Sequence, residues 1–118
     1  QILVVLNTGY SQPIAQLLLQ KLGWKQGTHY DALITASEVT NGRPMPDMIN
    51  LAKAQFDLEN AAHIAKIGDS AVDIEEGINA GCGLTIGITT GAHTKEQLLQ
   101  ANPHTVIDSL LQLPQLLQ

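Results

Sequence analysis

The chain has 118 residues, of which 44% are hydrophobic, 3% aromatic and 14% charged, and its formal net charge is −5. This length suffices for one domain with a single aliphatic core, and the composition excludes extensive disorder. The six Lys and Arg residues are scattered, which argues against binding to nucleic acid or an anionic membrane surface. The only cysteine, Cys82, excludes an internal disulfide. Since no apolar run reaches membrane-spanning length and no signal peptide is visible, we expect a cytoplasmic protein.

Apolar runs and helical spacing predict that strands and helices alternate from the start of the chain. We expect a buried strand over residues 2–6 and a polar loop over residues 7–11. A helix should begin at Pro13 and stop at Gly23, because these residues are typical of the first and the last turn. The next elements are a strand over residues 31–35, a polar loop over 36–45 and a helix that begins at Pro46.

The second half continues the same alternation. A buried strand over residues 64–67 should lead through the turn at Gly68 and Asp69 into a helix over about 71–80, with Ser70 as the N-cap and one apolar stripe at positions 71, 74, 78 and 81. We expect further strands over 84–88 and 105–107, separated by a short helix that a capping box at Thr94 starts. Ser109 should cap a terminal helix that Pro114 kinks or shortens. The pattern predicts an α/β fold with a doubly wound parallel sheet, as a single domain over residues 1–118.

Asp69 and Asp73 form a candidate magnesium site. Asp69 follows a predicted strand, at the edge where open α/β sheets place their ligands, and Asp73 lies in the first turn of the next helix. Two carboxylates beside the N–H groups of a helix terminus suit Mg²⁺, which takes one or two carboxylates and keeps several waters. In the alternative interpretation, Ser70 and Asp73 only form a capping box, and Asp69 only stabilises a turn. These residues alone leave both interpretations open.

Thr8, Gly9 and Arg43 form a candidate phosphate-binding group. The hydroxyl of Thr8 and the backbone N–H groups of this turn can hold a phosphoryl oxygen, and the Arg43 guanidinium suits phosphate geometry. Because loops after parallel strands meet at one edge, we expect Thr8, Arg43 and Asp69 to converge. Alternatively, these residues are an ordinary turn and a solvated surface arginine. His93 lies on another loop of this edge and is interpreted as a surface histidine.

Three segments resemble motifs of the haloacid dehalogenase (HAD) superfamily of phosphohydrolases, specifically its phosphonatase-like branch. Residues 6–9 resemble the second motif, whose hydroxyl bonds to the transferring phosphoryl group. Residues 41–48 resemble the third, with Arg43 where lysine is usual, as in phosphonoacetaldehyde hydrolase and its relatives. Residues 66–73 resemble the fourth, whose acidic residues fix Mg²⁺, and residues 76–81 and 90–94 are also similar to that branch. The resemblance implies a HAD-like core, a small phosphorylated or phosphonate substrate and Mg²⁺ as cofactor. It also implies catalytic roles for Thr8 and Arg43 and metal ligation by Asp69 and Asp73.

The sequence departs from this family at the first motif, because no Asp-x-Asp pair occurs in the 118 residues. In the family, the first of these aspartates is the nucleophile, the second is the acid/base, and a helical cap domain selects the substrate. We therefore expect this chain to be the carboxyl-terminal part of a hydrolase, without the family's first strand and cap, and to be inactive alone. The predicted strand over 2–6 should lie near that over 64–67, either across a gap or paired in parallel. The alternative is a non-catalytic α/β binding or interaction module, and a homodimer stays open.

Overall fold

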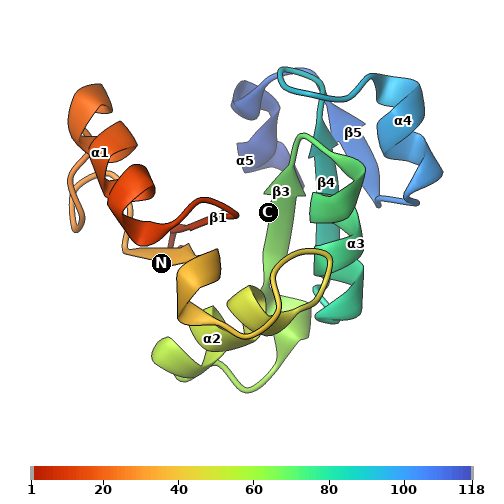
Figure 1. Ribbon diagram of the computed structural model, residues 1–118. Coiled ribbons are helices and arrows are strands. Elements are labelled where there is room, and N and C mark those ends of the chain that lie inside the picture. The colour runs from red at the N-terminus through yellow and green to blue at the C-terminus, as the bar shows by residue number, and fades with distance from the viewer. Residues whose placement is uncertain (1, 118) are drawn as a thin grey trace. The chain divides into compact units, whose positions relative to one another are not determined.

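Two compact units make up the chain, Gln1–Glu59 and Asn60–Gln118. The computed structural model describes residues 2–117, and strands alternate with helices in each unit (Figure 1). In the part of the chain that is described, no helix has the length and apolar character needed to cross a membrane. The described strands form two sheets, one in each unit, and every pairing within them is parallel. The α/β class and the parallel pairing that the sequence predicted are confirmed.

The first unit is a two-stranded parallel sheet with three helical segments. Its elements are β1 (Val5–Thr8), α1 (Gln12–Leu22), β2 (Ala32–Thr35), a 3₁₀ turn (Ala36–Glu38) and α2 (Asp47–Gln55). The two strands pair over their whole length, so that Thr8 and Thr35 stand side by side where the strands end. Buried side chains of both helices and of β2 form the core, namely Ala15, Leu19, Ala32, Ile34, Met48 and Ile49. Helix α1 ends as predicted at Gly23, whose φ of 73° is left-handed.

The first strand lies later in the chain than the sequence predicted. It spans Val5–Thr8 rather than residues 2–6, and Ile2 is 66% exposed instead of buried. The reason is that β2 offers only four residues for pairing. Before β1, the Asp31 N–H donates to the Val4 carbonyl at 2.7 Å, and the Val4 N–H donates to the Asp31 carboxylate at the same distance. Asp31 therefore extends the pairing of the two strands by one residue, to Val4, and the pairing ends there.

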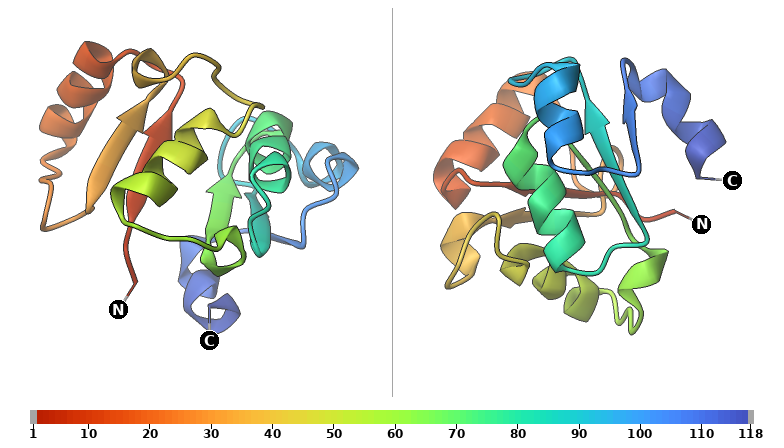
Figure 2. Two further views of the ribbon diagram at one scale, coloured as in Figure 1. Left: turned by 90° about the horizontal axis from the view of Figure 1, so that it is seen from below. Right: turned by 90° about the vertical axis from the view of Figure 1, so that its right-hand side faces the viewer.

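The second unit is a three-stranded parallel sheet in the order β3-β4-β5. Its elements are a 3₁₀ turn (Ala61–His63), β3 (Ala65–Gly68), α3 (Ala71–Asn79), β4 (Leu84–Ile88), α4 (Lys95–Gln100), β5 (Thr105–Ile107), a second 3₁₀ turn (Leu110–Gln112) and α5 (Leu113–Leu116). Helices α3 and α4 contact the strands from one side (Figure 2). Gly87 in the middle of β4 faces Ile74 of α3 and Leu98 of α4. Ile86 and Ile88, on either side of Gly87 in the strand, point to the opposite face and pack with Leu113 at the start of α5. Helical segments therefore cover both faces, as in a doubly wound fold.

Of two expectations for the helices of this unit, one is wrong and one is confirmed. Ile78 was expected on the buried stripe of α3, yet it is 47% exposed. The helix instead turns Gly77 towards the sheet, where a Cβ atom would come within 2.7 Å of the Thr85 side chain and 2.9 Å of Lys66. This close approach rotates Ile78 away from the sheet. The terminal helix is capped by Ser109 and shortened as predicted, because a 3₁₀ turn precedes α5 and Pro114 occupies the first turn of α5, where no N–H group is needed.

A buried ion pair fixes α3 to β3. The Lys66 ammonium lies 3.0 Å from a carboxylate oxygen of Glu76, whose side chain is completely buried, while that of Lys66 is 11% exposed. Cys82 is buried nearby, and burial raises the pKa of its thiol, with Lys66 acting in the opposite direction. A thiol with a raised pKa is mostly protonated at neutral pH, so Cys82 is a packing residue rather than a nucleophile.

We predict that Lys66→Met destabilises the fold by about 3 kcal/mol, because it removes the cation beside a buried carboxylate. The double variant Lys66→Met/Glu76→Met should recover most of this loss, since it removes the buried charge as well. Urea unfolding followed by circular dichroism measures both values. Equal destabilisation by the single and double variants would contradict this explanation, because removing the Glu76 carboxylate would then recover no stability.

Candidate active site

Thr8 and Gly9 form the turn that leaves the carboxyl end of β1. The backbone N–H of Tyr10 donates to the Thr8 hydroxyl oxygen at 3.2 Å, which closes a tight turn. In that bond the hydroxyl is the acceptor, so its own proton can be donated to a further oxygen. Thr8 is half-buried and Gly9 is exposed, so the turn is accessible from outside. The geometry suits a donor to a bound anion.

Arg43 lies against this turn, although 34 positions separate it from Gly9. A Cβ atom at position 9 would come within 2.8 Å of the Arg43 terminal nitrogen Nη2. Glycine at position 9 is therefore what allows the guanidinium to approach the backbone. The loop that carries Arg43 is held by Asp47, whose carboxylate accepts from the backbone N–H of Asn41 at 3.0 Å. Thr8, Gly9 and Arg43 thus lie together within the first unit, as the sequence predicted.

The loop after β2 is tied to the loop after β1. The Gln12 backbone N–H, at the start of α1, donates to the Ser37 hydroxyl at 3.2 Å, and that hydroxyl lies 2.8 Å from the Thr35 hydroxyl. Glu38 completes a capping box by accepting from the Thr35 backbone N–H at 2.7 Å. These bonds fix the two strand ends relative to each other. These hydrogen bonds were not predicted, although the Thr-x-x-Glu spacing of residues 35–38 is typical of a capping box.

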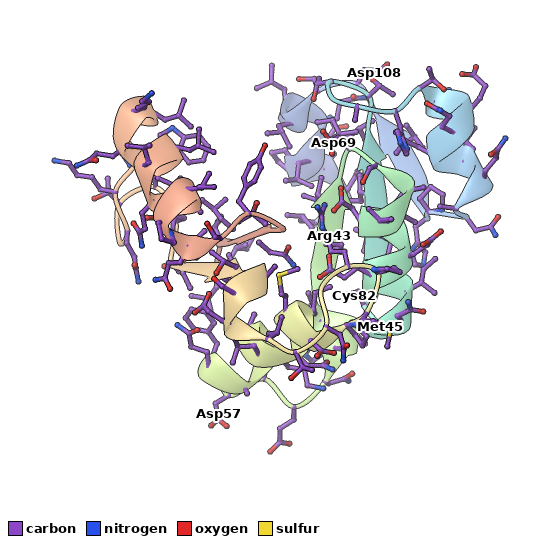
Figure 3. The ribbon with its side chains drawn as sticks, viewed as in Figure 1. Arg43, Met45, Asp57, Asp69, Cys82 and Asp108 are labelled. Atoms are coloured by element: carbon purple, nitrogen blue, oxygen red, sulfur yellow. The ribbon has the colours of Figure 1, made fainter. Side chains whose placement is uncertain are left out.

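Asp69 begins the turn between β3 and α3 in the second unit (Figure 3). Its carboxylate oxygen Oδ2 accepts from the backbone N–H of Ala92 at 3.3 Å. The carboxylate also packs so closely against Gly91 that any Cβ atom there would overlap it. Asp69 is only half-buried, so its carboxylate remains accessible to solvent. This arrangement holds a carboxylate at the carboxyl end of β3.

Asp73 lies one turn further along, inside the first turn of α3. Its Oδ2 accepts from the Ser70 backbone N–H at 3.2 Å and from the Ser70 hydroxyl at 2.9 Å, which makes a capping box. Asp73 is only 5% exposed, and its side chain fills the space beside Gly68. The capping box that the sequence offered as an alternative is therefore present. The bonds of this capping box go to the carboxylate oxygen Oδ2.

The donor set at the start of α3 fits Mg²⁺. Asp73 lies in the first turn of α3 and Asp69 in the turn just before it, and Mg²⁺ commonly takes one or two carboxylates and fills its other positions with water and phosphate oxygens. In residues 2–117, no group of three or more His, Cys, Asp or Glu side chains is placed to hold a metal ion. A closed all-protein cage of the kind that structural zinc prefers is thus not built from the described residues.

His93 has a defined position, which the sequence analysis did not predict. Its ring nitrogen Nδ1 accepts from the backbone N–H of Ala71, the first residue of α3, at 3.0 Å. Its own backbone N–H donates to the Asp69 carbonyl at 3.1 Å. His93 is therefore part of the turn that carries Asp69 rather than an independent surface histidine.

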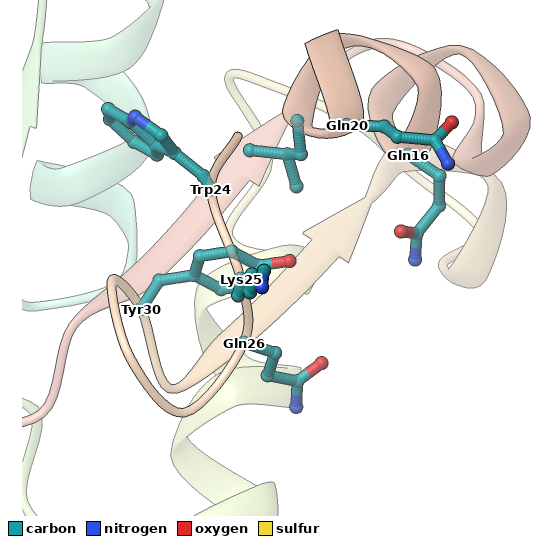
Figure 4. A pocket seen from close by; sticks show the side chains of 7 residues that line it. Gln16, Gln20, Trp24, Lys25, Gln26 and Tyr30 are labelled. Atoms are coloured by element: carbon teal, nitrogen blue, oxygen red, sulfur yellow. The ribbon is translucent and has the colours of Figure 1, made fainter. Parts of the chain in front are cut away.

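A separate pocket of about 420 Å³ lies between α1 and the loop that follows it (Figure 4). Its lining comprises Gln16, Leu19, Gln20, Trp24, Lys25, Gln26 and Tyr30. The Trp24 indole stacks on the His29 ring with 6.4 Å between ring centroids. The pocket is near the residues that precede β2, whereas Thr8 and Arg43 are near the residues that follow the strands. It is not part of the candidate active site.

Comparison with known proteins identifies the family. The HAD-hydrolase-like family model matches residues 40–113, which include Arg43, Asp69, Asp73 and His93. Over 85 residues the chain is 33% identical to a phosphonoacetaldehyde hydrolase of Latilactobacillus sakei, a match that covers 72% of this chain and 31% of that protein. It is 27% identical over 134 residues to a phosphonoacetaldehyde hydrolase of Syntrophobacter fumaroxidans, covering 95% of this chain and 48% of the relative. The chain thus spans a half or less of the length of these curated relatives.

A solved structure agrees with this assignment. The phosphonoacetaldehyde hydrolase-like protein of Oleispira antarctica superimposes with a TM-score of 0.77 at 25% sequence identity, covering 98% of this chain and 50% of that one. The superposition shows that the described elements follow the HAD fold, as the motifs predicted. On the family model, the relatives and the fold, this chain belongs to the HAD-hydrolase-like family and is a phosphonatase-like member of the HAD superfamily.

Proposed function

We propose that this chain supplies the phosphate-binding and Mg²⁺-binding parts of a hydrolase that acts on a small phosphate ester or phosphonate. The observation that carries the proposal is the contact between Arg43 and the turn at Thr8 and Gly9. A cationic fork, a hydroxyl and backbone N–H groups then face the same small region, which is the chemistry that binds a phosphoryl group. The names of the curated relatives support a phosphonate as one substrate class.

Each residue has a distinct role in this proposal. The Thr8 hydroxyl donates a hydrogen bond to a phosphoryl oxygen, and the Arg43 guanidinium balances the negative charge of the same phosphoryl group. Asp69 and Asp73 hold Mg²⁺. When bound, Mg²⁺ neutralises charge on the phosphoryl oxygens. The convergence of Thr8 and Arg43 with Asp69 stays a prediction, because Asp69 belongs to the other unit. The pairing or spacing of β1 relative to β3 likewise stays a prediction.

The nucleophile is the part that the 118 residues do not supply. The family's route forms a covalent aspartyl phosphate, and its Asp-x-Asp motif does not occur in this sequence. We therefore propose that the catalytic aspartates and the substrate-selecting cap lie outside this stretch. By itself the chain should bind Mg²⁺ weakly and release no phosphate. Mg²⁺-dependent hydrolysis by the 118-residue chain would contradict this part of the proposal.

The metal role is tested by Asp69→Asn in the protein expressed from its complete reading frame. We expect the variant to lose more than about tenfold of its Mg²⁺-dependent phosphate release, because even residues that only orient metal ligands cost this much. The matched control is Asp57→Asn, which removes a carboxylate at an exposed position with φ of 56°, a conformation that asparagine tolerates. The control should keep its activity. An Asp69→Asn enzyme with unchanged phosphate release would remove Asp69 from the metal site.

The phosphate role is tested by Thr8→Val in the same protein. Valine keeps the shape of threonine but has no hydroxyl, so we expect kcat to fall by about 100-fold, as for other lost donors to a transition-state oxygen. Thr28→Val is the control, since Thr28 is exposed in the loop before β2. Steady-state kinetics with p-nitrophenyl phosphate measure both variants. If Thr8→Val and Thr28→Val behave alike, the turn after β1 does not bind the phosphoryl group. A wild-type protein that releases no phosphate would instead favour the non-catalytic binding module.

A further inference from the structure

The loop between β4 and α4 is anchored at both of its ends. At its start, the Thr89 backbone N–H donates to the Ile107 carbonyl at 3.0 Å, and its hydroxyl donates to Asp108 at 2.9 Å. At its end, Thr94 caps α4 by accepting from the Gln97 backbone N–H at 3.2 Å. Both ends of the segment over residues 90–93 are therefore fixed, and this segment lies beside the turn that follows β3.

The middle of this loop makes all of its described hydrogen bonds to the turn after β3. Within residues 2–117, those of Ala92 and His93 go to Asp69 or Ala71. The Ala92 N–H donates to the Asp69 carboxylate, and the His93 N–H donates to the Asp69 carbonyl. Gly91 adds close packing against the same carboxylate. The orientation of Asp69 is thus set by a loop that lies more than 20 positions away in the sequence.

The His93 ring connects this loop to α3. Ala71 is the first residue of α3, and its N–H group has no acceptor within the helix. Nδ1 of His93 provides that acceptor at 3.0 Å. A ring nitrogen that accepts from an N–H group carries no proton, so the proton of the neutral ring is on Nε2. The ring therefore caps one orphan donor of α3 and keeps residues 91–93 over Asp69.

We infer that His93 is a positioning residue that orients the Asp69 carboxylate for Mg²⁺ through the loop at residues 91–93. The inference rests on the proposed metal role of Asp69. His93 itself is not a metal ligand in this account. It acts as metal-site partners outside the ligand set do, by fixing the orientation of a ligand through hydrogen bonds.

The test compares three variants of the protein, expressed from its complete reading frame, by NMR. His93→Leu keeps the bulk of the side chain but has no acceptor, whereas His93→Asn places an amide oxygen about where Nδ1 lies. His104→Leu is the matched control, because Nδ1 of His104 also accepts a backbone N–H, that of Thr85, at 2.9 Å, in the same unit. Amide exchange at positions 92 and 93 reports the loop. Amide shifts of Asp69 and Asp73 during a Mg²⁺ titration report metal binding, and thermal unfolding reports stability.

In the His93→Leu variant, we expect the backbone amide hydrogens at positions 92 and 93 to exchange faster with solvent. This variant should also bind Mg²⁺ about tenfold more weakly. His93→Asn should retain most of both properties. His104→Leu should lower the unfolding temperature but leave the two amides and the Mg²⁺ affinity of the folded chain unchanged. The inference is overturned if His93→Leu leaves amide exchange unchanged, or if His104→Leu affects Asp69 equally. If the wild-type protein from the complete reading frame shows no Mg²⁺-dependent shifts at Asp69 and Asp73, the metal role of Asp69 is refuted, and amide exchange still decides the role of His93.

Discussion

The turn between β3 and α3 constrains the candidate metal site more than any other part of the second unit. Gly68 ends the strand at a point where the Asp73 side chain leaves no space for a Cβ atom. This lets α3 begin immediately, with Ser70 as N-cap and Asp73 returning a hydrogen bond to it. Asp69 is then the residue between strand and helix. Asp69 and Asp73 therefore lie close together in the sequence at this junction, without a long loop between them.

This junction also has an electrostatic consequence. Asp73 lies in the first turn of α3, where a carboxylate gains about 0.3–1 kcal/mol from the helix dipole. Below this site, the Lys66–Glu76 pair and the contact of Gly77 with Lys66 and Thr85 hold α3 against the strands. The site therefore lies on a helix that is fixed along its length, which suits residues that must keep their geometry.

The sequence predicted those features that depend on neighbouring residues. The N-caps at Ser70 and Thr94 and the left-handed end of α1 at Gly23 are local patterns, and the structure contains all three. The start of β1 was placed too early, because only pairing with the four residues of β2 sets it. The face of α3 was misjudged, since a close approach at Gly77 outweighs the apolar character of Ile78.

The same distinction applies to the candidate site. Thr8, Arg43, Asp69 and Asp73 were predicted as site residues because each follows a strand or matches a motif. The hydrogen bond between Ala71 and His93 was missed, because it joins residues 22 positions apart, and no local pattern reports such a bond. Gly9 and Gly91 are a second example of what the sequence alone does not predict. The sequence shows a glycine, and only the fold shows which side chain requires the space, Arg43 in one case and Asp69 in the other.

Anomalous scattering tests the metal assignment most directly. Crystals of the protein grown with Mn²⁺ in place of Mg²⁺ and with inorganic phosphate would be measured at the manganese absorption edge. The account predicts an anomalous peak coordinated by the carboxylates of Asp69 and Asp73, at the start of α3. Manganese peaks only at other positions, with neither carboxylate among the ligands, would contradict it.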